Sequence, residues 1–503
     1  MRFRPIAIAA LMAASLAAVP TAASSVAAGP SATALPGVAG STSAATVGTP
    51  DAVPSAKPGA TAQPNVVIVL TDDQRYGTEV GMPTVMKELA AKGVLYPNAF
   101  IPTSWCCPSR TSLLTGNYSH STGVWENTAA VPYGAWPAFN RLGGERDTIA
   151  TRLQDAGYRT GIFGKYLNGI DKAPKDFAAP GWDVFDALIR PGPWKYSFMG
   201  ESKKANKSRQ YLTDELADRA VSFIESTPSD QPLFAFVTPY APHLPFVAGP
   251  YTGAAKKAGV MPAVRAASGL PSPAVNQRNM TGYPEWMQSL SRSQVFTKGV
   301  QHKLSTVIRL QQDMLMGIDA AVADVLDALE RTDRLRDTII VFASDNGYLL
   351  GEHRLQRKNT PYDASVRVPL VIRYDRAIAP GTQDDRLAVA NIDVYSTVLE
   401  LAGVSGAEVD GRSLLSAAPR DGLVMEAAPW RGQGRPAYCG WREEDFVFLR
   451  YATGEEEAYD YAADPYELRN VAADPAYADR VDVARERARM ECDPLPPLFT
   501  WEP

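Results

Sequence analysis

Short apolar runs recur along the chain from residue 65 onward, and most of them end at polar residues. The runs NVVIVL, TGIFG, LFAFVT, TIIVFAS and PLVIRY are continuous rather than alternating, which is typical of strands buried on both faces of a sheet. Segments with helical spacing lie between them, at residues 83–93, 147–157, 211–227 and 310–332. Strands that alternate with helices predict an α/β fold with a large, mostly parallel central sheet flanked by helices.

The polar residues that follow these runs form a second pattern. In chain order they are Asp72 and Asp73, then Lys165, then His243, and then Asp345 with Asn346. In open α/β sheets, ligands bind beyond the carboxyl ends of the strands. We therefore expect these side chains, although distant in sequence, to converge at one edge of the sheet.

Both ends of the chain differ from this core. Arg2, Arg4 and a short apolar run predict a signal peptide over residues 1–23, because the run is too short to cross a membrane; a buried helix is the less favoured interpretation. Residues 24–63 are almost all small residues and proline, as in a flexible linker. The protein is thus expected to be secreted or periplasmic, without a membrane anchor.

The organisation of the rest follows from composition. We predict a catalytic domain over residues 64–412 and a smaller α+β subdomain over residues 413–503, with a strand pair and a final helix. Residues 247–300 resemble a long loop over the site. A net charge of −5 argues against nucleic acid as the main partner. In an exported protein Cys439 and Cys492 are candidates for a disulfide, which the sequence leaves open.

The stretch CCPSRTSLLTG begins with two adjacent cysteines, Cys106 and Cys107, that lack the spacing of a zinc or redox motif. Pro108 suits the first turn of a helix, which would place Cys106 at the helix N-terminus, where negative charge is favoured. Arg110, one turn later, adds a planar anion-binding group. The stretch therefore predicts a nucleophile beside an anion site.

This stretch resembles the signature of type I sulfatases, and the segments NVVIVLTDDQ, GKYLN, APHLP, SDNGYLLGEHRL and KNTPYD extend the resemblance from residue 65 to about residue 470. The segments GKYLN and CCPSR are most similar to those of the N-acetylglucosamine-6-sulfatase and heparan endosulfatase branch. The resemblance implies an alkaline-phosphatase-like sandwich. It also implies that a formylglycine-generating enzyme oxidises Cys106 to formylglycine (3-oxoalanine), with Cys107 at a variable position.

The resemblance further implies a metal site. Carboxylate and amide oxygens suit a hard cation, and the implied ion is Ca²⁺, with Mg²⁺ as the alternative. Taken alone, an Asp-Asp pair is more often a turn or a helix cap. The implied metal ligands are Asp72, Asp73, Asp345, Asn346 and the modified Cys106.

The implied sulfate contacts are basic. Lys165, His243 and Lys358 match family positions that touch sulfate, where fixed cations stabilise developing negative charge. Either His243 or Lys358 would protonate the leaving alcohol, while the hydrated aldehyde attacks sulfur. The chain has Leu167 where many arylsulfatases have a histidine, so the base that expels sulfate stays open. His353 is a candidate substrate or structural contact.

The resulting hypothesis is a sulfatase that acts on a sulfated carbohydrate, such as N-acetylglucosamine-6-sulfate, or on an aryl sulfate. Two alternatives remain open at this point. One is a formylglycine-dependent phosphodiesterase or phosphonate monoester hydrolase. The other is an inactive, secreted carbohydrate-binding protein on the same scaffold.

Overall fold

Strand β1 (Asn65–Thr71) lies in the middle of the large sheet, and all of its residues are buried. The computed structural model describes residues 63–201, 206–207, 210–293, 298–405 and 408–502. The predicted signal peptide, and the predicted linker apart from residue 63, lie outside the described residues.

The large sheet has ten strands. Their order is β13 (Thr382–Gln383), β2 (Val94–Leu95), β12 (Leu370–Arg373), β9 (Thr338–Ser344), β1, β8 (Leu233–Thr238), β4 (Arg159–Gly164), β5 (Val184–Arg190), β6 (Lys195–Phe198) and β7 (Asn206–Lys207). Strands β9, β1, β8, β4 and β5 run parallel, whereas β12 and β6 are antiparallel to their inner neighbours. The predicted mostly parallel central sheet is confirmed.

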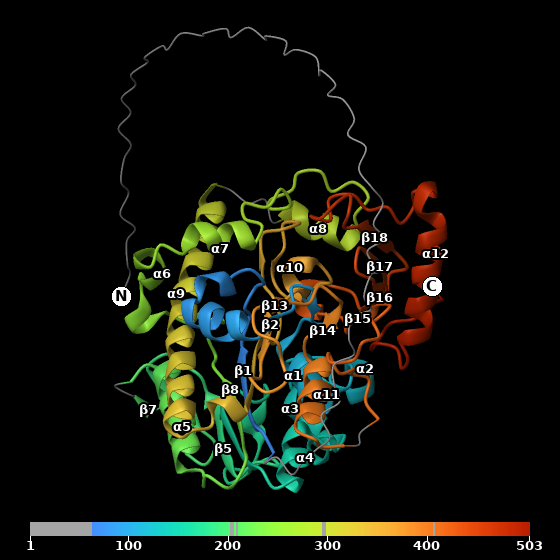
Figure 1. The fold of residues 1–503 in the computed structure, drawn as a ribbon. Helices are drawn as coiled ribbons and strands as arrows, with labels where there is room; N and C mark the ends of the chain where they lie inside the picture. The colour runs from blue at the N-terminus through green and yellow to red at the C-terminus, as the bar shows by residue number, and fades with distance from the viewer. Residues whose placement is uncertain (1–62, 202–205, 208–209, 294–297, 406–407, 503) are drawn as a thin grey trace, which may run out of the picture. The chain divides into compact units, whose positions relative to one another are not determined.

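Side-chain alternation along β1 divides the core into two layers. Val66, Ile68 and Leu70 belong to one apolar cluster, and Val67 and Val69 belong to the other. The first cluster includes residues of α1 (Cys106–Thr115), α3 (Ala135–Arg141), α4 (Ile149–Asp155) and α11 (Ile392–Leu401). The second includes residues of α5 (Leu212–Ser226) and α9 (Lys298–Arg331). The two helix groups therefore cover opposite faces of the sheet (Figure 1).

Two helical predictions need correction. The segment predicted as a helix over residues 83–93 is a π-helix, η2 (Val85–Leu89), followed by a 3-10 turn, η3 (Ala90–Lys92). The helix predicted over residues 310–332 begins earlier, at Lys298. Leu304, Val307 and Ile308 continue its apolar spacing upstream, and Gly299, a poor helix former, obscured that start.

The predicted loop over residues 247–300 also contains helices. They are α6 (Ala254–Lys257), α7 (Met261–Ala267) and α8 (Glu285–Ser293). Other short elements are α2 (Ser119–Thr122), α10 (Asp363–Val366), and the strand pairs β3 (Ala99–Phe100) with β14 (Ala388–Val389) and β10 (Leu349–Leu350) with β11 (Gln356–Arg357). Single 3-10 turns are η1 (Glu79–Gly81), η4 (Gly144–Arg146), η5 (Ile170–Lys172), η6 (Gly249–Tyr251), η7 (Leu335–Asp337), η8 (Arg431–Gln433) and η9 (Pro475–Tyr477).

A second, antiparallel sheet follows in the C-terminal part, with α12 beside it (Figure 1). Its strands are β15 (Leu423–Ala427), β16 (Tyr438–Arg442), β17 (Phe446–Tyr451) and β18 (Glu456–Asp460). The predicted strand pair is thus the outer half of a four-stranded sheet. The final helix is α12 (Ala478–Glu491), and a disulfide joins Cys439 in β16 to Cys492.

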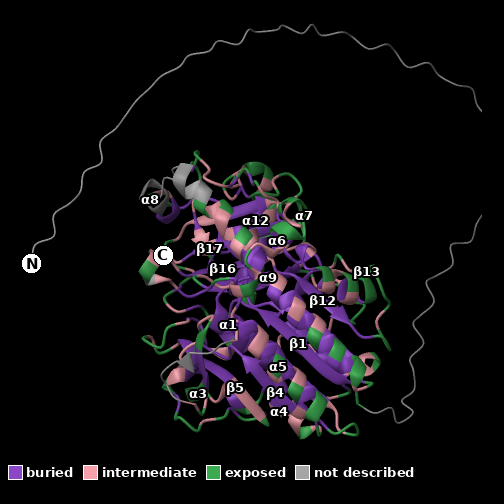
Figure 2. Cartoon of the chain, turned by 90° about the vertical axis from the view of Figure 1, so that its left-hand side faces the viewer, coloured by how far each residue is buried: buried purple, intermediate pink, exposed green. Residues whose placement is uncertain are grey.

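Burial follows this layering. In Figure 2 the strands of the large sheet are mostly buried, whereas α5 and α9 carry exposed residues on their outer side. Within the described part of the chain, none of the helices has the length and apolar character that crossing a membrane requires.

Candidate active site

Four of the predicted residues follow two neighbouring parallel strands. Asp72 and Asp73 come directly after β1, and Asp345 and Asn346 come directly after β9. The register pairs Thr71 with Ser344, so both strands end at the same level. The backbone N–H of Asp73 donates to Asp345 Oδ1 at 3.2 Å, which ties the two strand ends together.

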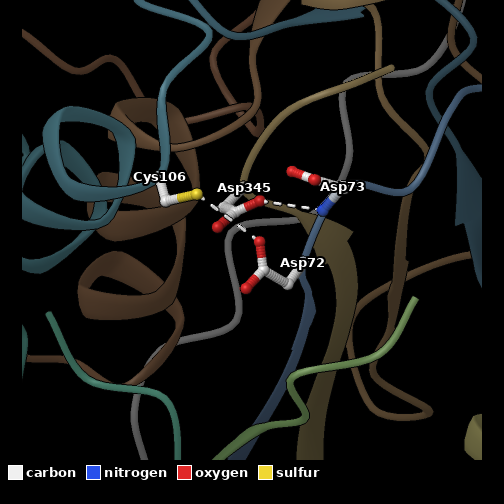
Figure 3. Close-up of side chains that lie close together, drawn as sticks. All are labelled: Asp72, Asp73, Cys106 and Asp345. Atoms are coloured by element: carbon white, nitrogen blue, oxygen red, sulfur yellow. Dashed lines mark hydrogen bonds between the residues drawn. The ribbon is translucent and has the colours of Figure 1, made fainter. Parts of the chain in front are cut away.

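Helix α1 directs Cys106 at these carboxylates. Its N-cap residue, Trp105, is extended, and the N–H of Cys107 donates to Asn127 Oδ1 at 2.7 Å. Figure 3 shows the Cys106 sulfur pointing toward the aspartates; Sγ lies 3.5 Å from Asp72 Oδ1. One ligand atom from each of the four residues Asp72, Asp73, Cys106 and Asp345 lies within 4.8 Å of the others.

Three buried cations face the three carboxylates. Lys165, directly after β4, donates to Asp72, and Arg110 Nε donates to Asp345 Oδ2 at 2.8 Å. The Lys358 ammonium contacts Asp73 and lies 2.7 Å from Cys106 Sγ. Opposite charges in one dry cluster compensate each other, which is the condition for burying them.

The cluster shifts the pKa values of its members in opposite directions. Burial favours a raised pKa for Asp72, but Lys165, His243 and Lys358 outweigh it and hold that pKa well below its usual range. Burial, with the Asp72 charge second, raises the pKa of the Cys106 thiol to about 12. The pKa of Lys358 lies well above its usual value, because Asp73 and its neighbours outweigh burial.

His243 lies at the open side of this cluster. Its side chain is 24% exposed, and Nε2 lies 3.7 Å from Asp73 Oδ2. Burial lowers its pKa despite the neighbouring aspartates. The Tyr240 ring lies 4.8 Å from the His243 ring and 5.3 Å from the Lys165 ammonium.

The structure brings every predicted site residue into this cluster. They are Asp72, Asp73, Cys106, Arg110, Lys165, His243, Asp345, Asn346 and Lys358. Two residues left open lie elsewhere. Leu167 is buried in the apolar core, and His353, 1% exposed, packs against Tyr283 and Tyr362.

Several neighbours of the site were not predicted. Tyr240 stands three residues before His243, so its proximity was readable from the segment PYAPH. Trp105 directly precedes Cys106, and its ring lies 5.6 Å from the Lys358 ammonium. Arg435 reaches the Lys358 loop from the C-terminal sheet, and nothing in its local sequence pointed there.

The donor set fits a hard cation. The carboxylates of Asp72, Asp73 and Asp345 offer oxygen atoms, and Asn346 Oδ1 is buried without a hydrogen-bond partner among the described residues. The amide nitrogen of Asn346 donates to Asp73 at 2.7 Å, which leaves the amide oxygen free to coordinate. Such oxygen sets bind Ca²⁺ or Mg²⁺ in preference to softer metals.

Comparison with known proteins decides the family. A sequence model of the family described as Sulfatase matches residues 64–404. The chain belongs to the sulfatase family. A second model, described as the C-terminal part of N-sulphoglucosamine sulphohydrolase, matches residues 351–491. The family resemblance of the CCPSR signature is therefore confirmed.

Curated relatives include members of the predicted branch. Human N-acetylglucosamine-6-sulfatase is 31% identical over 374 residues, covering 71% of this chain and 64% of that protein. An extracellular sulfatase SULF-1 homolog from Drosophila melanogaster is 32% identical over 368 residues, covering 70% of this chain and 31% of that protein. The match thus spans less than two thirds of these relatives' own length.

Solved structures share the fold of this sulfatase-family chain. One, a protein in complex with its substrate D-glucosamine-2-N,6-O-disulfate, has a TM-score of 0.71 at 22% identity and covers 86% of this chain and 97% of that one. The phosphonate monoester hydrolase of Agrobacterium radiobacter has a TM-score of 0.64 at 23% identity, covering 85% and 95%. These matches confirm the predicted alkaline-phosphatase-like architecture with its smaller C-terminal sheet.

Proposed function

We propose that this protein is a sulfuric ester hydrolase that releases inorganic sulfate from a sulfated carbohydrate of the N-acetylglucosamine-6-sulfate type. The observation that carries the proposal is the position of Cys106. Its sulfur lies in a buried cluster of three carboxylates and is 2.7 Å from the Lys358 ammonium. The similarity to N-acetylglucosamine-6-sulfatase supports the reaction, and the similarity to a structure bound to D-glucosamine-2-N,6-O-disulfate supports the substrate class.

Unsatisfied polar atoms support a charged ligand at this cluster. Arg110 Nη2 and His243 Nδ1 are buried and make no hydrogen bond to any described residue. Buried polar groups are normally paired, so such atoms call for a partner that the chain itself does not supply. A sulfate group would supply acceptor oxygens for these nitrogens.

Each residue receives a role in this proposal. Asp72, Asp73, Asp345 and Asn346 would hold Ca²⁺, with Mg²⁺ as the alternative. With Cys106 converted to formylglycine, the hydrated aldehyde would supply the nucleophile, and an ion held by these residues would help to orient the sulfate.

The cations act on the substrate side. Lys165 and Arg110 stabilise the negative charge that grows on the sulfate oxygens in the transition state. His243 or Lys358 donates a proton to the leaving alcohol, since both carry donor nitrogens at the cluster. Cys107 has no part, because it is fully buried in the apolar core beneath the site.

Mass spectrometry tests the nucleophile first. The protein is produced in a host that makes formylglycine, and the tryptic peptide covering residues 93–110 is measured. We expect the aldehyde or its hydrate at Cys106, unchanged in a Cys107→Ser variant, together with sulfate release from N-acetylglucosamine-6-sulfate. A thiol at Cys106, with a control sulfatase from the same host converted, would sink the proposed mechanism.

A second candidate rests on the similarity to the phosphonate monoester hydrolase fold. The same cluster would then act on a phosphorus ester. Turnover of an aryl sulfate is compared with turnover of an aryl phosphodiester at equal concentrations. A higher kcat/KM for the phosphodiester would favour this candidate, whereas binding of sulfated sugar without turnover of either ester would favour an inactive binding protein.

Export is the remaining part of the proposal. The apolar run within residues 1–23 has the length and flanks of a signal peptide. An expressed full-length chain should be recovered outside the cytoplasm with an N-terminus near residue 24. Recovery of the intact N-terminus inside the cells would contradict it.

A further inference from the structure

The loop that carries Lys358 has an unusual backbone. Arg357 and Asn359, on either side of Lys358, have φ values of 75° and 61°. His353 and Arg354, a few residues earlier, have φ values of 51° and 59°. None of these residues is glycine, and left-handed backbone of this kind persists only where the surrounding structure enforces it.

Arg435 is one of the side chains that hold this loop. It lies between β15 and β16 of the C-terminal sheet and is 6% exposed. Its Nη1 donates to the carbonyl oxygens of Lys358 and Asn359, and its Nη2 donates to the carbonyl oxygen of Gln356 at 3.2 Å. One guanidinium thus binds three carbonyls that flank the Lys358 side chain.

Among the described residues, no carboxylate pairs with Arg435 to neutralise its charge. Arg442, buried in the neighbouring strand, pairs with Asp363 at 2.8 Å, whereas no described carboxylate lies within ion-pair distance of Arg435. A buried cation without a carboxylate is costly, and the charge of Arg435 is offset by the three loop carbonyls that it binds. Holding the backbone around Lys358 therefore accounts for a cation at this position.

Residues 430–435 form a short hairpin, in which Trp430 pairs with Arg435, and aromatic contacts link this hairpin to the Lys358 ammonium. The Arg435 guanidinium lies 4.9 Å from the centre of the Trp430 ring. The Trp430 ring lies 4.6 Å from the Trp105 ring, which in turn lies 5.6 Å from the Lys358 ammonium. The residue 430–435 hairpin therefore holds the backbone of Lys358 directly and reaches its side chain through Trp105.

We propose that Arg435 is a positioning residue for Lys358. By holding the backbone of Lys358, Arg435 keeps the Lys358 ammonium against residue 106. This inference rests on the proposed function, because it takes Lys358 to act on the sulfate ester. Arg435 itself touches neither the carboxylates nor Cys106. The active site is thus completed by a residue from the C-terminal sheet, outside the region that the Sulfatase family model matches.

The test is a double-mutant cycle. Arg435→Met should lower kcat for sulfate release by about 10- to 100-fold, since a misplaced catalytic group costs that much, with KM changed less than about threefold. In a Lys358→Ala background the same substitution should cost less than about threefold, because the positioned group is already gone. Losses that multiply in the double variant would overturn the proposal.

Control variants separate positioning from folding. Arg450→Met removes another arginine of the same sheet, which pairs with Glu456 at 3.0 Å and does not contact the loop. It should lower the melting temperature without changing kcat. Arg435→Lys keeps the charge but cannot bind three carbonyls, so it should recover only a small part of the activity, and it replaces Arg435→Met where that variant does not fold.

Hydrogen exchange gives a readout that does not need turnover. Amides of residues 352–362 should exchange about tenfold faster or more in Arg435→Met, and at the wild-type rate in Arg450→Met. Unchanged exchange in Arg435→Met would overturn the proposal that Arg435 holds the Lys358 loop. If the wild-type protein releases no sulfate from any ester, the proposed function fails, and the exchange result still decides whether Arg435 holds the loop.

Discussion

Among the buried carboxylates of the described residues, those at the edge of the large sheet and Glu457 in the C-terminal sheet are satisfied in opposite ways. In the large sheet, Asp72 and its neighbouring aspartates face ammonium and guanidinium groups. In the C-terminal sheet, Glu457 is fully buried and accepts hydrogen bonds from the hydroxyls of Tyr362, Tyr451 and Tyr459. The pKa of Asp72 is held well below its usual value, whereas burial raises the pKa of Glu457 to about 7.

This difference in partners distinguishes carboxylates that can take part in ligand binding from a carboxylate that serves the fold. Buried polar atoms that have no hydrogen-bond partner among the described residues, such as Arg110 Nη2 and Asn346 Oδ1, are free to bind a charged ligand. Glu457 has neutral donors on both oxygens and leaves nothing for a ligand. The cluster at the edge of the large sheet should therefore control turnover, and Glu457 should control the pH dependence of folding.

The largest expected effect comes from replacing Cys106, the residue that supplies the proposed nucleophile. Cys106→Ala should lower sulfate release by at least about 10⁴-fold, because the nucleophile is lost, while the melting temperature stays close to that of the wild type. Assays of sulfate release and thermal unfolding check both parts. Cys107→Ala is the matched control; a comparable loss of activity there would contradict the assignment.

A smaller effect is expected from weakening the metal site. Asp345→Asn should reduce activity by about 10²-fold and abolish the rise in melting temperature that added Ca²⁺ produces in chelator-treated wild type. Asp319→Asn is the control. It changes a buried aspartate that accepts hydrogen bonds from the N–H groups of Thr84 and Val85 and is not part of the cluster. That control should keep its calcium response, and a lost response in both variants would speak against a specific site.

The second region is probed by its disulfide. Replacing Cys439 and Cys492 by alanine opens a link across a sequence separation of 53 residues, which should cost about 4 kcal/mol of unfolding free energy on the chain-entropy account. Denaturant unfolding measures the change. Activity at 25 °C should be retained, so an inactive but folded variant would show that the two regions are more tightly coupled than we infer.

The smallest effect concerns pH. The folded-state pKa of Glu457, about 7, lies above its unfolded value near 4.5, so the folded state binds the proton more tightly. Its contribution is full below about pH 4.5 and is lost as pH rises to 7, with a slope of about 1.4 kcal/mol per pH unit. The difference in unfolding free energy between wild type and Glu457→Gln should fall by that slope. Parallel pH curves would refute it.

Much of the large sheet could be predicted from the sequence. Continuous apolar runs rich in β-branched residues, such as NVVIVL, favour buried strands, and the polar residues that end them are expected to meet where parallel strands end. The placement of Asp72, Lys165 and Asp345 followed from that rule. The antiparallel direction of β12 could not be predicted, because strand direction leaves no trace in a short apolar run.

The contribution of the C-terminal region was harder to predict. Arg435 stands in the segment GQGRPAY, which has neither periodicity nor a motif, and its contact with Lys358 spans 77 positions. The Cys439–Cys492 link stayed open because spacing alone does not give geometry. Contacts of this kind arise from packing between distant segments, which local sequence does not encode.

The burial of Cys106 also sets an order of events. Its side chain is 1% exposed and lies against Lys358 and the carboxylates, so an enzyme that makes the proposed formylglycine would not reach it in the folded protein. The proposed conversion must therefore happen on the unfolded chain, before the sheet closes. Molecules that fold before conversion would keep an inaccessible thiol. The active fraction would therefore depend on the rate of modification relative to the rate of folding.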